Sequence, residues 1–114
     1  MLHAVIDPVS NRADWIDQCE VRDDEDGQLI DLTGAVIVLA VRDRLSMANV
    51  MLAQTSDGSI VVQGMGVFGF TFPLSKMRAL VGSRAYDVAC TVQLNGITQQ
   101  FFLGSVNVLD GIVP

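Results

Sequence analysis

Short hydrophobic runs separated by turn residues make up most of this chain. The clearest case is residues 85–94, where Tyr86, Val88, Cys90 and Val92 alternate with smaller or polar residues. A repeat of two residues is typical of a β-strand with one buried face. Asn95-Gly96 follows directly and is among the strongest short signals for a β-hairpin. Similar runs recur about every ten residues, a spacing that predicts an all-β sandwich or barrel.

The same pattern predicts the remaining strands and turns. We expect strands at residues 14–22, 28–32, 35–41, 50–54, 59–63, 68–72 and 97–103, with 105–109 as a last strand or an extension. Asp57-Gly58 predicts a hairpin between 50–54 and 59–63. Residues 74–81 instead carry hydrophobic side chains at helical spacing, directly after Pro73, which predicts one short helix that links the sheets.

The run AVIVLAV at residues 35–41 is hydrophobic at every position, so it does not alternate. A strand with one wet face alternates, whereas a strand covered on both faces does not. This segment is therefore either a central strand covered on both sides within the chain, or one whose outer face lies in a subunit contact.

Charge and size exclude several classes of protein. The 114 residues fit a single domain, and the net charge of −6, from seven basic and thirteen acidic residues, argues against nucleic-acid binding. The longest apolar run is residues 35–41, far below the roughly 20 residues that span a bilayer. The N-terminus has no secretion-signal pattern, so we expect a protein made in the cytoplasm without a membrane anchor.

Residues that could carry chemistry are few and scattered. His3 is the one histidine, and Cys19 and Cys90 lie in strand-like segments without basic neighbours. We expect both thiols to be reduced and buried; the alternative is a strand-to-strand disulfide of the immunoglobulin kind. The acidic run at residues 23–27 does not match a calcium-loop spacing. We therefore expect no enzyme, no cofactor and no metal, although two distant acids such as Asp31 and Asp87 could be brought together by folding.

One stretch of the sequence resembles small proteins of tailed phages and prophages. The resemblance rests on Trp15, the acidic turn 23–27, Ile30-Asp31-Leu32-Thr33-Gly34-Ala35, and the apolar strand that ends at Arg42-Asp43. Farther along, the order Asp57-Gly58, Phe72-Pro73-Leu74 and Tyr86-Asp87-Val88 is also similar. The chain resembles the immunoglobulin-like N-terminal domain of siphophage upper baseplate proteins.

This resemblance implies an immunoglobulin-like antiparallel β-sandwich with one short helix, formed by a single domain over residues 1–114. It further implies a structural virion component of the phage tail or baseplate, in contact with other tail proteins and with copies of itself. The alternative function is a carbohydrate- or protein-binding β-sandwich module. Neither function involves nucleic acid or a membrane.

Contact residues are expected mainly in the irregular segment after the apolar strand. This segment, residues 42–51, mixes charged side chains with Met, and the candidates are Arg42, Arg44, Met47, Asn49 and Met51. Trp15 is expected either in the core or at the interface. Residues 1–12 are expected to form a docking arm.

Overall fold

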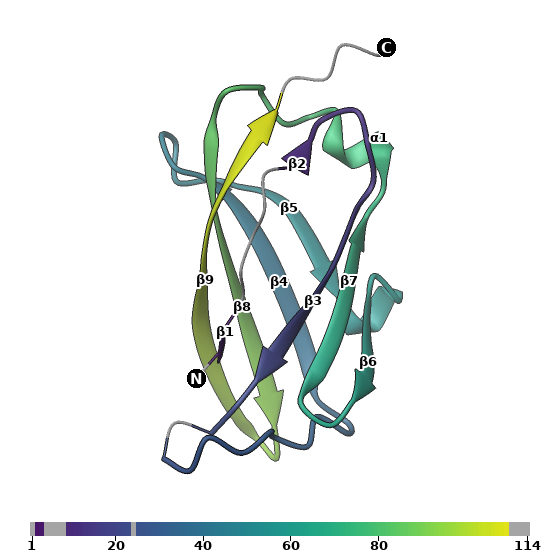
Figure 1. Cartoon of the computed structure of the whole chain (residues 1–114), viewed down its shortest axis with the longest axis vertical. Helices are drawn as coiled ribbons and strands as arrows, with labels where there is room; N and C mark the ends of the chain where they lie inside the picture. Colours follow the sequence, from purple (N-terminus) through teal and green to yellow (C-terminus); the bar gives the residue numbers. More distant parts are fainter. Residues whose placement is uncertain (1, 4–8, 24, 110–114) are drawn as a thin grey trace.

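In the computed structural model the described residues are 2–3, 9–23 and 25–109, with side chains described for 9–23, 25–100 and 104–109. Two β-sheets pack face to face (Figure 1). One contains, in spatial order, β1 (Leu2–His3), β3 (Trp15–Val21), β7 (Val67–Phe72) and β6 (Ile60–Gly64). The other contains β2 (Val9–Ser10), β9 (Ile97–Leu109), β8 (Ala85–Leu94), β4 (Val36–Asp43) and β5 (Asn49–Gln54).

This strand order is that of an immunoglobulin-like sandwich. β1, β3, β7 and β6 occupy the positions of strands A, B, E and D, and β9, β8, β4 and β5 those of G, F, C and C′. All neighbouring strands are antiparallel except β2, which pairs parallel with β9. The expected all-β sandwich is therefore confirmed, including its one short α-helix, α1 (Leu74–Met77), which connects β7 to β8 in the other sheet.

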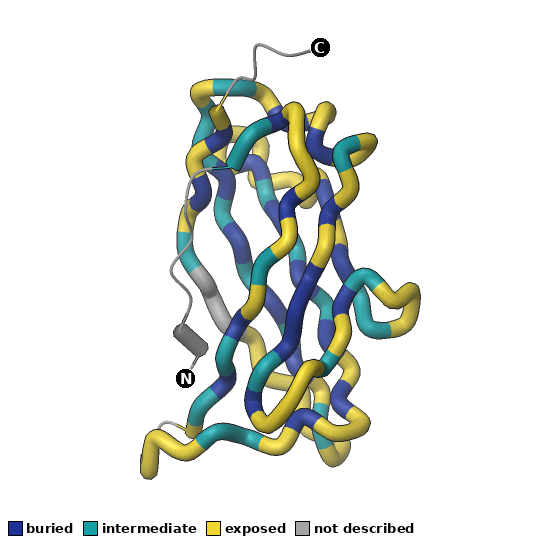
Figure 2. The backbone as a smooth tube through the Cα atoms, turned by 45° about the vertical axis from the view of Figure 1, so that its right-hand side comes forward, coloured by how far each residue is buried: buried dark blue, intermediate teal, exposed yellow. Residues whose placement is uncertain are grey.

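The core lies between the sheets and follows the predicted alternation (Figure 2). Phe68, Phe70 and Phe72 all point inward from β7, and Trp15 of β3 packs edge-on against Phe70 with ring centroids 5.2 Å apart. Tyr86 is also buried, and its hydroxyl oxygen accepts a hydrogen bond from the Val81 backbone N–H at 3.0 Å. This bond ties the start of β8 to the segment after α1.

The predicted hairpin at Asp57-Gly58 is wrong. β5 and β6 belong to different sheets, and the 3₁₀ turn η1 (Thr55–Asp57) carries the chain across from one to the other. Gly58 does have the positive φ, 82°, that the Asp-Gly pair predicts. A hairpin and a crossing between sheets both need such a turn, so the local pattern does not distinguish them.

The predicted strand at residues 28–32 is also wrong, since only one isolated bridge, Arg22 to Leu29, forms there. The Asp31 carboxylate accepts hydrogen bonds from the N–H and hydroxyl of Thr33, which favours a turn over a strand. The helix is shorter than the predicted 74–81, although Met77 and Leu80 are buried as expected. Residues 97–109 form one continuous strand with a bulge.

The described part of the expected docking arm, residues 2–3 and 9–12, lies on the chain's own sheets. β1 pairs with β3 and β2 with β9, while the Asn11 side-chain amide donates to the Leu80 carbonyl at 3.2 Å. Residues 1 and 4–8 lie outside the described residues. Among the helices of the described segments, none has the length and apolar character needed to cross a bilayer.

Candidate protein-contact surface

The outer face of the five-stranded sheet shows how the outward side chains of the hydrophobic run at residues 35–41 are placed. Ile37, Leu39 and Val41 point into the core, whereas Val36 is 48% exposed and Val38 and Ala40 are half-buried on the outside. β4 is central within its sheet, between β8 and β5, yet no described element of the chain covers its outer face. The described residues thus do not show coverage on both sides, and the subunit contact stays a prediction.

A shallow hollow of about 570 Å³ lies on this outer face. Its middle is lined by the small side chains Val38, Ala40 and Ala89, which stand on the adjacent strands β4 and β8. Longer side chains surround them, namely Arg42, Asn49, Leu52, Asp87, Thr91 and Gln100. The hollow thus results from small residues at the centre of the sheet and long ones at its margins.

A network of charged side chains lies at one margin of this hollow. Arg42 of β4 and Asp87 of β8 are register partners, and their Nη2 and Oδ2 atoms lie 3.1 Å apart. Arg44 also donates to Asp87, from Nη2 at 3.0 Å and Nε at 3.2 Å. Ser105 of β9 donates to the same carboxylate at 3.3 Å and contacts Arg44 as well. One carboxylate therefore orients two guanidinium groups.

Two opposing effects set the pKa of Asp87. Burial of this side chain, which is 13% exposed, would by itself raise the pKa. The hydrogen bonds from Arg44 and Arg42 outweigh it, and the pKa of Asp87 is lowered below its usual value. The Asp87 carboxyl group is therefore ionised at neutral pH and accepts hydrogen bonds from both arginines. The Nε–H of Arg42 is itself buried and has no acceptor among the described residues.

The turn from β4 to β5 projects beside the network. Asp43, 9% exposed, accepts hydrogen bonds from the Leu45 backbone N–H at 3.0 Å and from Arg84 at 3.2 Å. Met47 has a positive φ of 61°, which is uncommon outside glycine, and its N–H donates to the Asp43 carbonyl. The tip carries two exposed apolar side chains, Leu45 at 76% and Met47 at 58%.

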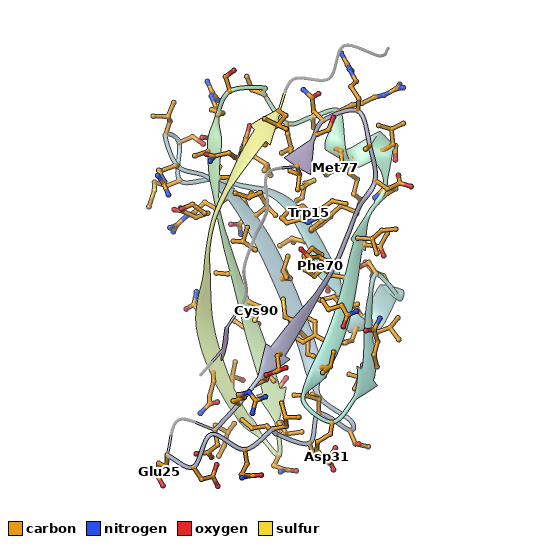
Figure 3. The ribbon with its side chains drawn as sticks, viewed as in Figure 1. Trp15, Glu25, Asp31, Phe70, Met77 and Cys90 are labelled. Carbon is orange, nitrogen blue, oxygen red and sulfur yellow. The ribbon has the colours of Figure 1, made fainter. Side chains whose placement is uncertain are left out.

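Four of the six predicted contact residues gather at this corner. Arg42, Arg44, Met47 and Asn49 present side chains at the surface. Met51 and Trp15 are each only 5% exposed and belong to the core, so neither side chain is available to a partner. Met51 is the inward neighbour of Val50 and Leu52 on β5, while Trp15 belongs to the aromatic cluster shown in Figure 3.

Asp87 and Leu52 also line this hollow, although they are not among the six predicted contact residues. The alternation in β5 and β8 could have placed both on the outer face, because each is offset by one position from a core residue. That Asp87 lies opposite Arg42 depends on the register of two strands 45 residues apart. The sequence pattern carries no information about that register.

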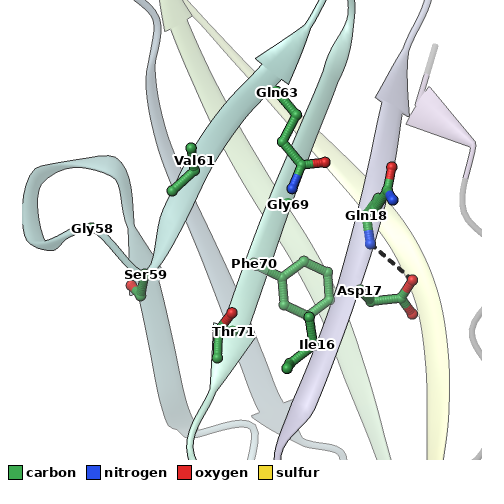
Figure 4. Close-up of a pocket in the computed structure, with 10 residues that line it drawn as sticks. All are labelled: Ile16, Asp17, Gln18, Gly58, Ser59, Val61, Gln63, Gly69, Phe70 and Thr71. Carbon is green, nitrogen blue, oxygen red and sulfur yellow. Dashed lines mark hydrogen bonds between the residues drawn. The ribbon is translucent and has the colours of Figure 1, made fainter.

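A smaller hollow of about 250 Å³ lies on the outer face of the other sheet (Figure 4). Its floor is Gly69, and the Gln63 side chain lies so close that a Cβ at position 69 would be 2.4 Å from Nε2. Ile16 and Val61 stand exposed at the rim.

The candidate chemical groups among the described residues are two buried cysteines and two acids that lie apart. Cys19 and Cys90 are free and buried, and burial is the main cause that raises the pKa of each thiol to about 12. Asp31 precedes β4 and Asp87 lies opposite Arg42 near its far end, so folding does not pair them. No group of three or more His, Cys, Asp or Glu within the described segments could hold a metal ion. The side chain of His3 lies outside the described residues.

Comparison with known proteins returned no matching family model, no similar curated protein and no similar solved structure.

Proposed function

We propose that this chain is a structural subunit of a phage tail or baseplate, located in the virion and assembled through protein–protein contacts with tail neighbours and with copies of itself. The observation that carries the proposal is the uncovered outer face of the five-stranded sheet. It exposes Val50 and Leu52 on β5, which follows the apolar tip of the β4–β5 turn, and Val36 at the opposite end of β4. Exposed apolar groups in contiguous positions are typical of surfaces that another protein covers.

The charged network supports the same function. Arg42 and Arg44 are held in place by Asp87, so a partner that binds them does not have to order two long side chains. The phage resemblance described above supplies the biological setting, which no physical property of this surface specifies.

The test is to delete the gene from the phage or prophage that encodes this chain and to examine purified particles. We expect the chain in the mass spectrum of wild-type virions, and defective tails in electron micrographs of the deletion. Complementation with Arg42→Ala/Arg44→Ala should restore assembly less well than complementation with the wild-type chain. Absence from virions together with normal tails in the deletion would overturn the proposal.

A binding module is the second candidate, and the hollow favours it. Its volume of about 570 Å³ is within the range of small-ligand sites, and Arg42, Asn49 and Gln100 offer hydrogen-bonding groups. A glycan array and a pull-down with the purified chain test this candidate, and two negative results would exclude it.

A further inference from the structure

β5 forms an open edge of the five-stranded sheet. It pairs with β4 on one side only and is the last strand in that sheet. Open edges can pair with another strand, and proteins often protect them with charged residues or proline. The sequence of β5, NVMLAQ, has neither.

Hydrogen bonds of the neighbouring residues show which backbone groups point outward. The Gln54 N–H donates to Ser59 Oγ at 2.8 Å, and its carbonyl accepts from the same hydroxyl at 3.3 Å, so both groups face away from β4. Backbone groups in an antiparallel strand alternate between the two sides. The N–H and carbonyl of Leu52, two residues earlier, are therefore directed at the open edge.

The backbone groups of β4 that point toward β5 agree with this direction. The Ile37 N–H points toward the β5 side, where it donates to Thr55 Oγ1 at 3.1 Å. Leu39 and Val41 have the same parity and are the register partners of Ala53 and Met51. The ladder between β4 and β5 thus uses the inward residues of β5 and leaves Leu52 unused.

A hollow of about 560 Å³ runs along this edge. Val50 and Leu52, 40% and 39% exposed, line it on the β5 side. Its other lining residues include Asp57 in η1, which directly follows β5, and Lys76 in α1. Figure 1 shows α1 at the upper end of the molecule and the turn after β5 at a lower level. The lining of the hollow thus includes one positive and one negative side chain.

We propose that β5 pairs antiparallel with β5 of a second copy, so that two five-stranded sheets become one continuous sheet across a two-fold axis. The axis reverses the direction of the second copy, so the N–H and carbonyl of Leu52 in each copy can pair with those of the other. On the outer face the Val50 and Leu52 side chains of both copies pack together. β5 adds no charge to the contact, although each copy has a net charge of −6.

This inference rests on the proposed function only in that it names one contact by which copies assemble. The test is sedimentation velocity of the full-length chain from about 1 to 500 μM, the range in which a weak dimer is detected. We expect the mass to rise with concentration from 12.3 kDa toward twice that value. Amide exchange at Leu52 should slow over the same range.

Leu52→Lys places two like charges beside the axis and should raise the dissociation constant at least about tenfold. The matched control is Ile16→Lys, which changes an outward residue, 72% exposed, on β3 of the other sheet. It should leave the dimer unchanged. Leu52→Pro is a second variant. Proline lacks the N–H that Leu52 directs at the open edge, and the β4 ladder does not use that N–H. Circular dichroism checks that each variant is folded.

Three results would overturn the inference. They are a chain that stays monomeric throughout, a dimer that Leu52→Lys leaves intact, or a dimer that Ile16→Lys weakens equally. Each of them leaves the proposed function to be decided by the virion test, because a tail subunit can be held by its neighbours alone. Presence in virions without this dimer would separate the two proposals.

Discussion

Asp87 is the residue that organises the candidate surface. Its carboxylate is the common acceptor for Arg42, Arg44 and Ser105, which come from β4, the turn after it, and β9. Without it, two guanidinium groups would lie close together with no counter-charge between them. The arrangement of the corner therefore depends on one ionised side chain.

Asp87→Asn should lower the free energy of unfolding at pH 7 by about 1 kcal/mol, a modest value because both arginines are partly exposed. The pKa of Asp87 is lowered in the folded chain, so its contribution is present above the ordinary value of 3.8 and is lost as the pH falls through the folded value. Urea unfolding at pH 7 and pH 2.5 measures both effects.

The control for this prediction is Glu25→Gln, which removes an exposed carboxylate from the loop between β3 and β4. It should change stability by less than about 0.5 kcal/mol at either pH. If Asp87→Asn were equally neutral at pH 7, or if its effect persisted at pH 2.5, the network would not stabilise the fold as described.

The tight turn between β6 and β7 depends on a glycine for two separate reasons. Gly66 has a φ of 70°, and a Cβ there would lie 2.9 Å from both Leu29 Cβ and the Val21 carbonyl oxygen. Gly34, before β4, has a similar φ of 77° but open space around it. Substitutions at these two glycines therefore separate the free-energy cost of the backbone conformation from that of a steric clash.

Gly34→Ala should cost about 1 kcal/mol, the penalty of a left-handed conformation for an L-residue. Gly66→Ala should cost about 3 kcal/mol, because the backbone at Val21 has to move as well. Thermal melts of both variants check this, with about 4–8 °C expected per kcal/mol for a domain near this size. Equal losses would show that the close approach at Gly66 does not constrain the fold.

The sandwich as a whole is held by packing, without a covalent link between the sheets. Cys19 of β3 and Cys90 of β8 occupy the two strands that an immunoglobulin disulfide joins, yet both are free and buried in the core (Figure 3). Burial raises the pKa of both thiols to about 12. At pH 8 only about one thiol in 10⁴ would be ionised.

We therefore expect Ellman's reagent to label neither cysteine in the native chain at pH 8, and to label both rapidly in guanidinium chloride. Ser46→Cys, in the exposed β4–β5 turn, is the control and should react at once in the native chain. A reducing agent should leave the melting temperature unchanged. Rapid native labelling of Cys19 or Cys90, or a drop in melting temperature on reduction, would contradict this account.

Much of the fold was predictable because the signals are local. The alternation at residues 85–94 and at Phe68, Phe70 and Phe72 identified strands and their buried faces correctly. The exposure of the six candidate contact residues was predicted less well. Arg42, Arg44, Met47 and Asn49 were placed at the surface as expected, but Met51 is inward by strand parity and Trp15 lies in the aromatic core.

The sequence by itself determined most of the longer strands, the inward faces of strands such as β7 and β8, and the turns with positive φ at Gly58 and Gly96. These follow from side-chain alternation and glycine's conformational freedom, which act over a few residues. Only the tertiary structure decided that the turn at Gly58 crosses between sheets, that Asp87 meets Arg42, and that β4 keeps an uncovered face while β5 forms an open edge. These depend on which distant strands pair and in what register, and that is set by the packing of the whole core.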